Sequence, residues 1–206
     1  MVRRIKQEAG ISICVSFGFL TEAVAAAFKE AGVDRYNHNL NAAESFYPQI
    51  CSTHSYQDRL QTLRIARNAG LELCCGVLFG LGESESDILE LSLALRELSP
   101  DSIPVNFIHP HEGTPLENRK LLTPYTCLIL LCLMRFLNPS AEIRAAGGRE
   151  LSLRSLQPLA LYPANSLFVS GYLTTSGQKP DEAWQMIEDM GFEIEHDIAD
   201  EVGVTI

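Results

Sequence analysis

The 206-residue sequence predicts an α/β fold, namely a partial TIM (β/α)8-type barrel with about six strand–helix units and without the first two strands. Short apolar runs alternate with amphipathic stretches throughout the chain, which is typical of parallel strand–helix repeats. The opening residues RRIKQEAG have the pattern of the last turns of a helix whose own strand is missing. This second feature favours a barrel over an open doubly wound sheet.

Each predicted strand is a short apolar run. The six runs are ISICVSFG from residue 11, VDRYNHNL from 33, LELCCGVLFG from 71, SIPVNFIHP from 102, EIRAAGG from 142 and SLFVSGY from 166. Four amphipathic stretches end at a glycine that is followed by an apolar residue, which predicts helix C-caps at Gly10, Gly32, Gly70 and Gly191.

Helical periodicity fills the gaps between these runs. The predicted helices cover 21–31, 55–69, 84–98, 124–137, about 152–162 and 180–190. Their starts are indicated by Ser55 with Asp58, by Ser84 with Asp87, and by Thr123 ahead of Pro124. No break interrupts the repeat, so the sequence predicts one domain over 1–195 and an acidic tail over 196–206.

Composition excludes several classes of function. The net charge is −10 and the pI is near 4.9, which argues against a nucleic-acid partner. There is no apolar run of 18 residues and no signal-peptide core, which predicts a cytoplasmic protein without a membrane span. Six cysteines are too few for a disulfide scaffold of this length, so we expect thiols or metal ligands.

Polar residues stand where barrel strands usually carry branched apolar ones. They are Cys14, Asn37, Asn39, Cys74, Asn106 and Arg144. Burying such groups is costly unless they hold a ligand or each other. The alternation of side chains along a strand predicts that Cys74 and Cys75 point to opposite faces and that His38 turns outward. Because alternate strands share a layer, we expect the two cysteines and the arginine in one layer and the asparagines in another.

The other cysteines and histidines give weaker signals. Cys127 and Cys132 lie in an apolar helix and are predicted to pack in the core. Cys51 and His54 have the spacing of a metal pair, although a plain loop is the favoured interpretation. His109 and His111 follow a strand, where a barrel carries its catalytic rim, and a solvated loop is again favoured.

Six motifs, in order, resemble the biotin synthases, which are radical S-adenosylmethionine (SAM) enzymes. They are GVDRYNHNLN (32–41), STHSYQDRL (52–60), LELCCG with GLGE (71–83), DSIPVNFIHPHEGTPL (101–116), AEIRAAGGRE (141–150) and ANSLFVSGYLTTSGQ (164–178). The resemblance covers roughly residues 5–195, the C-terminal two-thirds of such an enzyme. It implies sulfur insertion into dethiobiotin, with a 5′-deoxyadenosyl radical removing hydrogen from two carbons.

The resemblance also implies roles for individual residues. Cys14, Cys74 and Arg144 would be three of the four ligands of a 2Fe-2S cluster that donates sulfur. Residues that would contact SAM are Asn39, Asn41, Arg59 and, in an element similar to G-x-I-x-G-x-x-E, Gly76 and Gly80. Asn37, Asn39 and Asn106 would hold the ureido ring of dethiobiotin. The implied partners are an electron donor, such as flavodoxin or ferredoxin, and a second copy of the chain in a homodimer.

The sequence departs from the family pattern in two ways. The motif Cys-x-x-x-Cys-x-x-Cys, which binds the 4Fe-4S cluster in the family, does not occur in it, and neither does the fourth ligand of the 2Fe-2S cluster. Position 41 is Asn where some relatives have an acidic residue. We therefore expect this chain alone to be inactive. The alternatives are another radical SAM barrel enzyme, or a non-catalytic remnant that only binds a ligand or partner.

Overall fold

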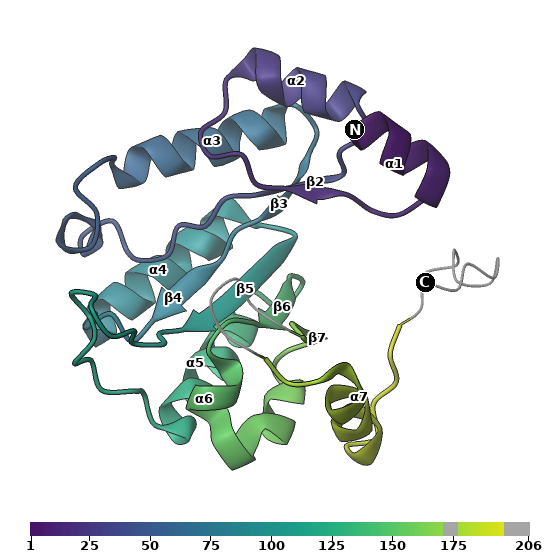
Figure 1. The fold of residues 1–206 in the computed structure, drawn as a ribbon. Coiled ribbons are helices and arrows are strands. Elements are labelled where there is room, and N and C mark those ends of the chain that lie inside the picture. The colour runs from purple at the N-terminus through teal and green to yellow at the C-terminus, as the bar shows by residue number, and fades with distance from the viewer. Residues whose placement is uncertain (171–176, 196–206) are drawn as a thin grey trace.

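A computed structural model describes residues 1–170 and 177–195. The predicted acidic tail, 196–206, and part of the motif at 164–178 lie outside these described residues. Within them, seven short strands form one parallel sheet in the order β1-β2-β3-β5-β6-β7, with β4 paired to β5 (Figure 1). The strands are β1 (Cys14–Val15), β2 (Arg35–Asn37), β3 (Glu72–Cys74), β4 (Val77–Phe79), β5 (Ser102–Phe107), β6 (Glu142–Ala145) and β7 (Ser166–Leu167).

Strands β3 and β4 are two parts of one predicted strand. Cys74 pairs with Ser102 and Val77 pairs with Val105, so both parts keep the same register against β5. The interruption includes Gly76, where an added Cβ would lie 2.8 Å from both the Asn39 side chain and the Pro104 carbonyl. The six predicted strand positions are therefore all present, and the prediction of a partial parallel barrel is confirmed.

The helices follow the predicted ranges closely. They are α1 (Val2–Ala9), α2 (Glu22–Glu30), α3 (Tyr56–Asn68), α4 (Glu85–Leu98), α5 (Pro124–Leu137), α6 (Arg149–Leu153) and α7 (Pro180–Asp189), with 3-10 helices η1 (Tyr47–Gln49) and η2 (Arg154–Leu161). Ser55 and Ser84 both form the predicted capping boxes, which hold the first turns of α3 and α4. The prediction of one helix over about 152–162 was wrong, because most of it is the 3-10 helix η2, which contains Pro158.

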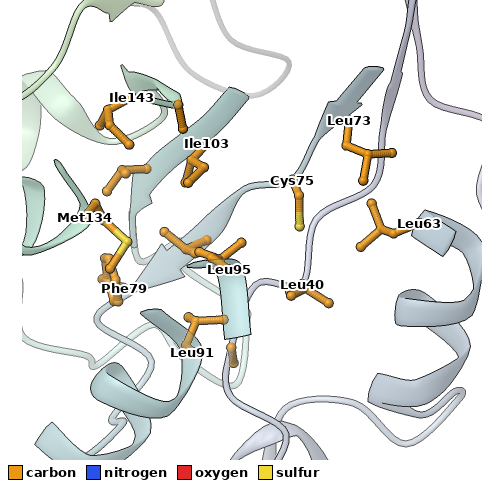
Figure 2. Close-up of a cluster of buried hydrophobic side chains, with 14 of the residues drawn as sticks. Leu40, Leu63, Leu73, Cys75, Phe79, Leu91, Leu95, Ile103, Met134 and Ile143 are labelled. Carbon is orange, nitrogen blue, oxygen red and sulfur yellow. The ribbon is translucent and has the colours of Figure 1, made fainter. Parts of the chain in front are cut away.

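One face of the sheet packs against the helices. Tyr36, Leu73, Ile103 and Ile143 point to this face and are fully buried. The same core contains Leu63 of α3, Leu95 of α4 and Met134 of α5, several of which are drawn in Figure 2. Burying one such leucine or isoleucine side chain contributes about 1.5 to 3 kcal/mol. This apolar layer fixes the strands and so fixes the opposite face.

Cys127 and Cys132 behave differently, although both lie on α5. Cys127 is fully buried in the core, as predicted. Cys132 is exposed, so its assignment to core packing was wrong. Five residues at about 100° each separate the two side chains around the helix, and they therefore lie on different faces.

The other face of the sheet is concave and polar. Burial alternates along β2 and β6, with partly buried Arg35, Asn37, Glu142 and Arg144 on this face. Arg35 of β2 reaches Glu142 of β6 at 3.0 Å although β3 and β5 lie between their strands. Such a contact requires the sheet to curve toward this face. The polar residues predicted to form the site therefore share the inside of a partial barrel.

Among the described residues, no helix is long and apolar enough to span a membrane.

Candidate functional site

The side chains of Cys14 and Cys74 meet on the concave face. Each thiol affects the pKa of the other, although β2 separates the two strands that carry them. Contact with the Cys14 thiol, the Asn37 amide at 3.2 Å and the nearby Arg144 guanidinium lower the pKa of Cys74, against the opposing effect of burial. The Cys74 contact and burial raise the pKa of Cys14. Of the two thiols, Cys74 is therefore the one that loses its proton more readily.

The spacing of the strands suits a bridging metal centre better than a disulfide. Strands that are two positions apart lie about 9 to 10 Å from each other in a flat sheet, whereas disulfide Cα atoms are usually less than about 7 Å apart. The sulfur atoms of Cys14 and Cys74 can thus approach each other while their backbones stay apart. Among the described residues, no group of three or more His, Cys, Asp or Glu side chains forms a metal site. A metal ion or cluster would therefore need other donors besides the two sulfurs.

Arg144 is the third predicted member of this site and lies beside both cysteines. Its charge acts on the pKa of Cys14 and of Cys74. Its Nε donates to Ser166 Oγ at 2.9 Å, and its guanidinium lies 5.1 Å from the centre of the Phe168 ring. The two sulfur atoms and the guanidinium therefore lie on the same face of the sheet and influence one another electrostatically.

Cys75 turns away from the site. It is fully buried and lies among Leu40, Leu63 and Leu73 on the helix side of the sheet (Figure 2). The predicted opposite orientation of Cys74 and Cys75 is confirmed.

Hydrogen bonds link the three asparagines to Cys74, to each other or to the neighbouring backbone. Asn37 pairs in register with Cys74 and donates to its sulfur, so it lies at the same level. Asn39 accepts from Asn37 Nδ2 at 3.3 Å and from the Gly76 backbone at 2.8 Å. Asn106 donates to Val77 O at 3.0 Å and accepts from Gly147 N at 2.9 Å.

The loop after β2 and the turn after β4 surround the predicted SAM contacts. Asn41 has a positive φ of 68°, and its carbonyl accepts from Leu78 N at 2.9 Å. Gly80 has a φ of 99°, which an L side chain rarely adopts, and its N–H donates to Glu83 Oε1 at 2.7 Å. Glu83 also accepts from Gly82 N at 2.9 Å, so one carboxylate shapes the whole turn.

Arg59 is held from three sides. It donates to the Asn39 carbonyl at 2.8 Å, to His54 Nε2 at 3.1 Å and to the Tyr47 hydroxyl. Tyr47 and His54 are themselves 2.9 Å apart. Cys51 lies 3.5 Å from His54 Nδ1, but no third metal ligand joins them among the described residues. His54 is thus a support for Arg59, a role that the sequence did not indicate.

His38 lies outside the concave face, as predicted. Its ring packs edge-on against Phe19 at 5.4 Å, and its side chain is only 7% exposed. Burial first, and then the charges of Arg59 and His54, lower the pKa of His38 to about 4.

This pKa predicts a pH dependence of stability. Between pH 6.5 and about 4 the unfolded chain binds a proton that folded His38 does not. The contribution of neutral His38 is therefore complete above pH 6.5 and is lost as the pH falls toward 4, by up to roughly 3 kcal/mol. Urea unfolding of the wild type and of His38→Phe at pH 7 and 4.5 checks this, because the carboxylates titrate in both proteins. Equal losses in the two proteins would contradict the assignment.

Several residues of the concave face were missed at the sequence level. Arg35, Glu72 and Glu142 stand two positions before Asn37, Cys74 and Arg144 on the same strands, so the period of two places them on the same face. The sequence alone could therefore have placed these three residues on the concave face. The contacts of Tyr47 and His54 were not predictable in this way, because these residues lie outside the predicted strands.

Two family models match the chain. Residues 1–95 match the radical SAM superfamily, and residues 104–193 match the biotin and thiamin synthesis associated domain. Among solved structures, methylornithine synthase (PylB) has a TM-score of 0.80 with 21% identity over 98% of this chain and 64% of that chain. HydG from Carboxydothermus hydrogenoformans has a TM-score of 0.75 with 18% identity over 93% of this chain and 50% of that chain. These structures share the fold.

Curated relatives are much closer in sequence. The biotin synthase of Acaryochloris marina is 54% identical over 94% of this chain, and that of Geobacillus thermodenitrificans is 50% identical over 98%. The chain spans 56% and 61% of the lengths of these two relatives. With such identity over nearly its whole length, and with both family models matched, the chain is similar to the biotin synthases and to the radical SAM superfamily.

Proposed function

We propose that this chain provides the sulfur-donor site and the substrate-binding site of a biotin synthase, which inserts sulfur into dethiobiotin to form biotin. The observation that carries the proposal is that Cys14, Cys74 and Arg144 share the concave face and influence one another electrostatically. One exposed and one buried cysteine near a guanidinium are an unusual set for one face of a sheet. They fit a 2Fe-2S cluster that takes one more ligand from elsewhere.

Each of these side chains has a separate task. Bound there, a 2Fe-2S cluster would supply the sulfur atom that dethiobiotin acquires. Cys74 is the more readily deprotonated sulfur donor, because its surroundings lower its pKa. Cys14 must lose its proton when a metal binds, which makes metal uptake dependent on pH. Arg144 adds a positive charge that offsets the negative charge of the sulfur atoms.

The asparagines are suited to the cyclic urea of dethiobiotin. A carboxamide carries two N–H donors and one oxygen acceptor, so it can match both the N–H and the C=O groups of a ureido ring. Backbone hydrogen bonds to Asn39 and Asn106 fix the planes of their amides before a ligand arrives. Asn37 links this region to Cys74 and so places the substrate next to the sulfur donor.

SAM is the second small molecule in the proposal. Arg59 is the candidate for binding its carboxylate, since a guanidinium can form two parallel hydrogen bonds with a carboxylate. Asn39 and Asn41 are the candidates for the ribose. Neither Gly76 nor Gly80 has room for a side chain, since an added Cβ would lie 2.8 Å from Asn39 Oδ1 or 2.6 Å from Ile108 Cγ2. The 4Fe-4S cluster that cleaves SAM needs the three-cysteine motif, which this sequence does not contain.

Two protein partners complete the proposal. An electron donor such as flavodoxin or ferredoxin would reduce the complete enzyme. A homodimer is supported by the apolar residues Tyr125, Ile129 and Phe136, which are exposed along α5.

The proposal predicts that the chain by itself does not form 5′-deoxyadenosine from SAM. After anaerobic reconstitution with iron, sulfide and a reductant, chromatography should detect none above background, because three of the required thiolates are absent. A fusion to the preceding segment of the Acaryochloris marina biotin synthase should form both 5′-deoxyadenosine and biotin. A fusion that cleaves SAM but never converts dethiobiotin would contradict the proposed function.

A further inference from the structure

Four charged side chains form a continuous ion-pair chain across the concave face. Glu72 of β3 pairs with Arg35 of β2, whose NH2 lies 2.9 Å from Glu72 Oε2. The NH1 of Arg35 donates to Glu142 Oε2 at 3.0 Å. The other oxygen of Glu142, Oε1, accepts from Arg144 NH2. The order Glu72, Arg35, Glu142, Arg144 alternates in sign and ends beside the two cysteines.

The central link of this ion-pair chain joins parts of the molecule that are far apart in sequence. Arg35 and Glu142 are 107 residues apart, and their strands are separated by β3 and β5. Both side chains are 25% exposed, and that of Arg144 is 21% exposed, so water screens these charges only in part. Burial alone would raise the pKa of Glu142, but the charges of Arg144 and Arg35 outweigh it and keep the carboxylate ionised.

The contacts of Arg144 restrain its guanidinium on several sides. Glu142 binds NH2, Ser166 binds Nε and the Phe168 ring lies against the guanidinium plane. Arg149 donates to the Phe168 carbonyl at 3.0 Å, which holds Phe168 in place. The remaining nitrogen, NH1, has no hydrogen-bond partner among residues 1–170 and 177–195, and it is the atom left for a ligand.

We propose that Arg35 and Glu142 are positioning residues that hold the Arg144 guanidinium beside the sulfur atoms of Cys14 and Cys74. The importance of this arrangement for catalysis rests on the proposed function, in which Arg144 is a cluster ligand. An unrestrained arginine side chain loses rotamer freedom when its guanidinium binds a ligand. The ion pairs restrict Arg144 before any ligand arrives, and Arg35 does so without touching Arg144.

A chemical-labelling experiment on the 206-residue chain tests the proposal without any cluster. The rate at which phenylglyoxal modifies Arg144 is measured by peptide mass spectrometry in the wild type, Arg35→Met and Glu142→Gln. In both variants we expect labelling of Arg144 to accelerate on the order of tenfold, because a charge-assisted restraint is lost. The effect of Arg35→Met is decisive, since Arg35 acts on Arg144 only through Glu142.

Two controls separate positioning from a general loss of structure. Arg67 donates to the carbonyl of Ser99 at 2.7 Å, away from the ion-pair chain, and its labelling should stay unchanged. Arg3→Met removes an exposed ion pair with Glu30 and should not alter Arg144. Unchanged labelling of Arg144 in Arg35→Met, or equal acceleration at Arg144 and Arg67, would overturn the proposal.

Iron uptake by the same wild-type chain is measured separately. A wild type that binds no iron would count against the proposed cluster site, while the labelling rates would still decide whether Arg35 and Glu142 position Arg144.

Discussion

Replacing Cys74 with alanine is expected to abolish iron–sulfur cluster assembly, whereas replacing its neighbour Cys75 is expected to leave assembly largely intact. The two residues are adjacent and both are buried, but only Cys74 faces the concave side. Loss of its thiolate removes one of the two sulfur donors available there. Because a cluster held by one protein thiolate is not retained, we expect iron content to fall at least about tenfold.

The measurement is iron and sulfide content together with the visible absorption spectrum after anaerobic reconstitution. A small thiol in the buffer can serve as the fourth ligand. The two variants should rank in the opposite order for their effect on the unfolding free energy. Cys75→Ala leaves a cavity among Leu40, Leu63 and Leu73 and should cost about 1 kcal/mol of unfolding free energy. Cys74→Ala removes a group from a polar face and should change the unfolding free energy less.

Cys132→Ala serves as the neutral control, since Cys132 is exposed on α5. If Cys75→Ala lost the cluster and Cys74→Ala kept it, the orientation of the strand would not determine the site. If both variants lost it together with the cooperative unfolding transition, Cys74 would be a structural residue. A wild-type chain that takes up no iron would show that two cysteines and Arg144 do not suffice by themselves.

The alternation of side chains along a strand explains why so much of this site was predictable. It places Cys74 and Asn37 on one face and Cys75 and His38 on the other from the sequence alone. The same rule also places the residues of the ion-pair chain on this face, since Arg35, for example, precedes Asn37 by two residues. The ion pairs themselves were not predicted, because alternation assigns a side chain to a face but does not say which side chains on that face are in contact.

Contacts that depend on curvature could not be predicted. Arg35 meets Glu142 only because the sheet bends, and the degree of bending depends on the packing of the helices behind it. The support of Arg59 by Tyr47 and His54 depends on the path of a loop that contains a 3-10 turn. The helical pattern near 152–162 does not form one α-helix, because Pro158 has no N–H to donate to an α-helical hydrogen bond.

Arg149→Met is expected to lower the free energy of unfolding by about 3 to 5 kcal/mol, the largest stability effect that we predict. The Arg149 side chain is fully buried at the start of α6. Its NH1 donates to Gln157 at 2.5 Å and to Gln178 at 3.0 Å, and its NH2 donates to Glu150 and to the Phe168 carbonyl. Methionine keeps the apolar stem but supplies no donor, so buried acceptors lose their partner. A typical domain is stable by about 5 to 15 kcal/mol, so this loss is a large fraction of the total.

Urea unfolding at pH 7 measures the effect, and Arg3→Met is the control. Arg3 forms one exposed ion pair, so its replacement should cost less than about 1 kcal/mol. The double variant Arg149→Met/Glu150→Gln should recover part of the loss, because it removes the carboxylate that Arg149 neutralises across 3.1 Å. A single-variant loss below about 1 kcal/mol would contradict the prediction and would mean that α6 is held by apolar packing alone. Since Arg149 also holds Phe168 against Arg144, the same variant should expose Arg144 to phenylglyoxal, so stability and the order of the candidate site depend on one buried charge.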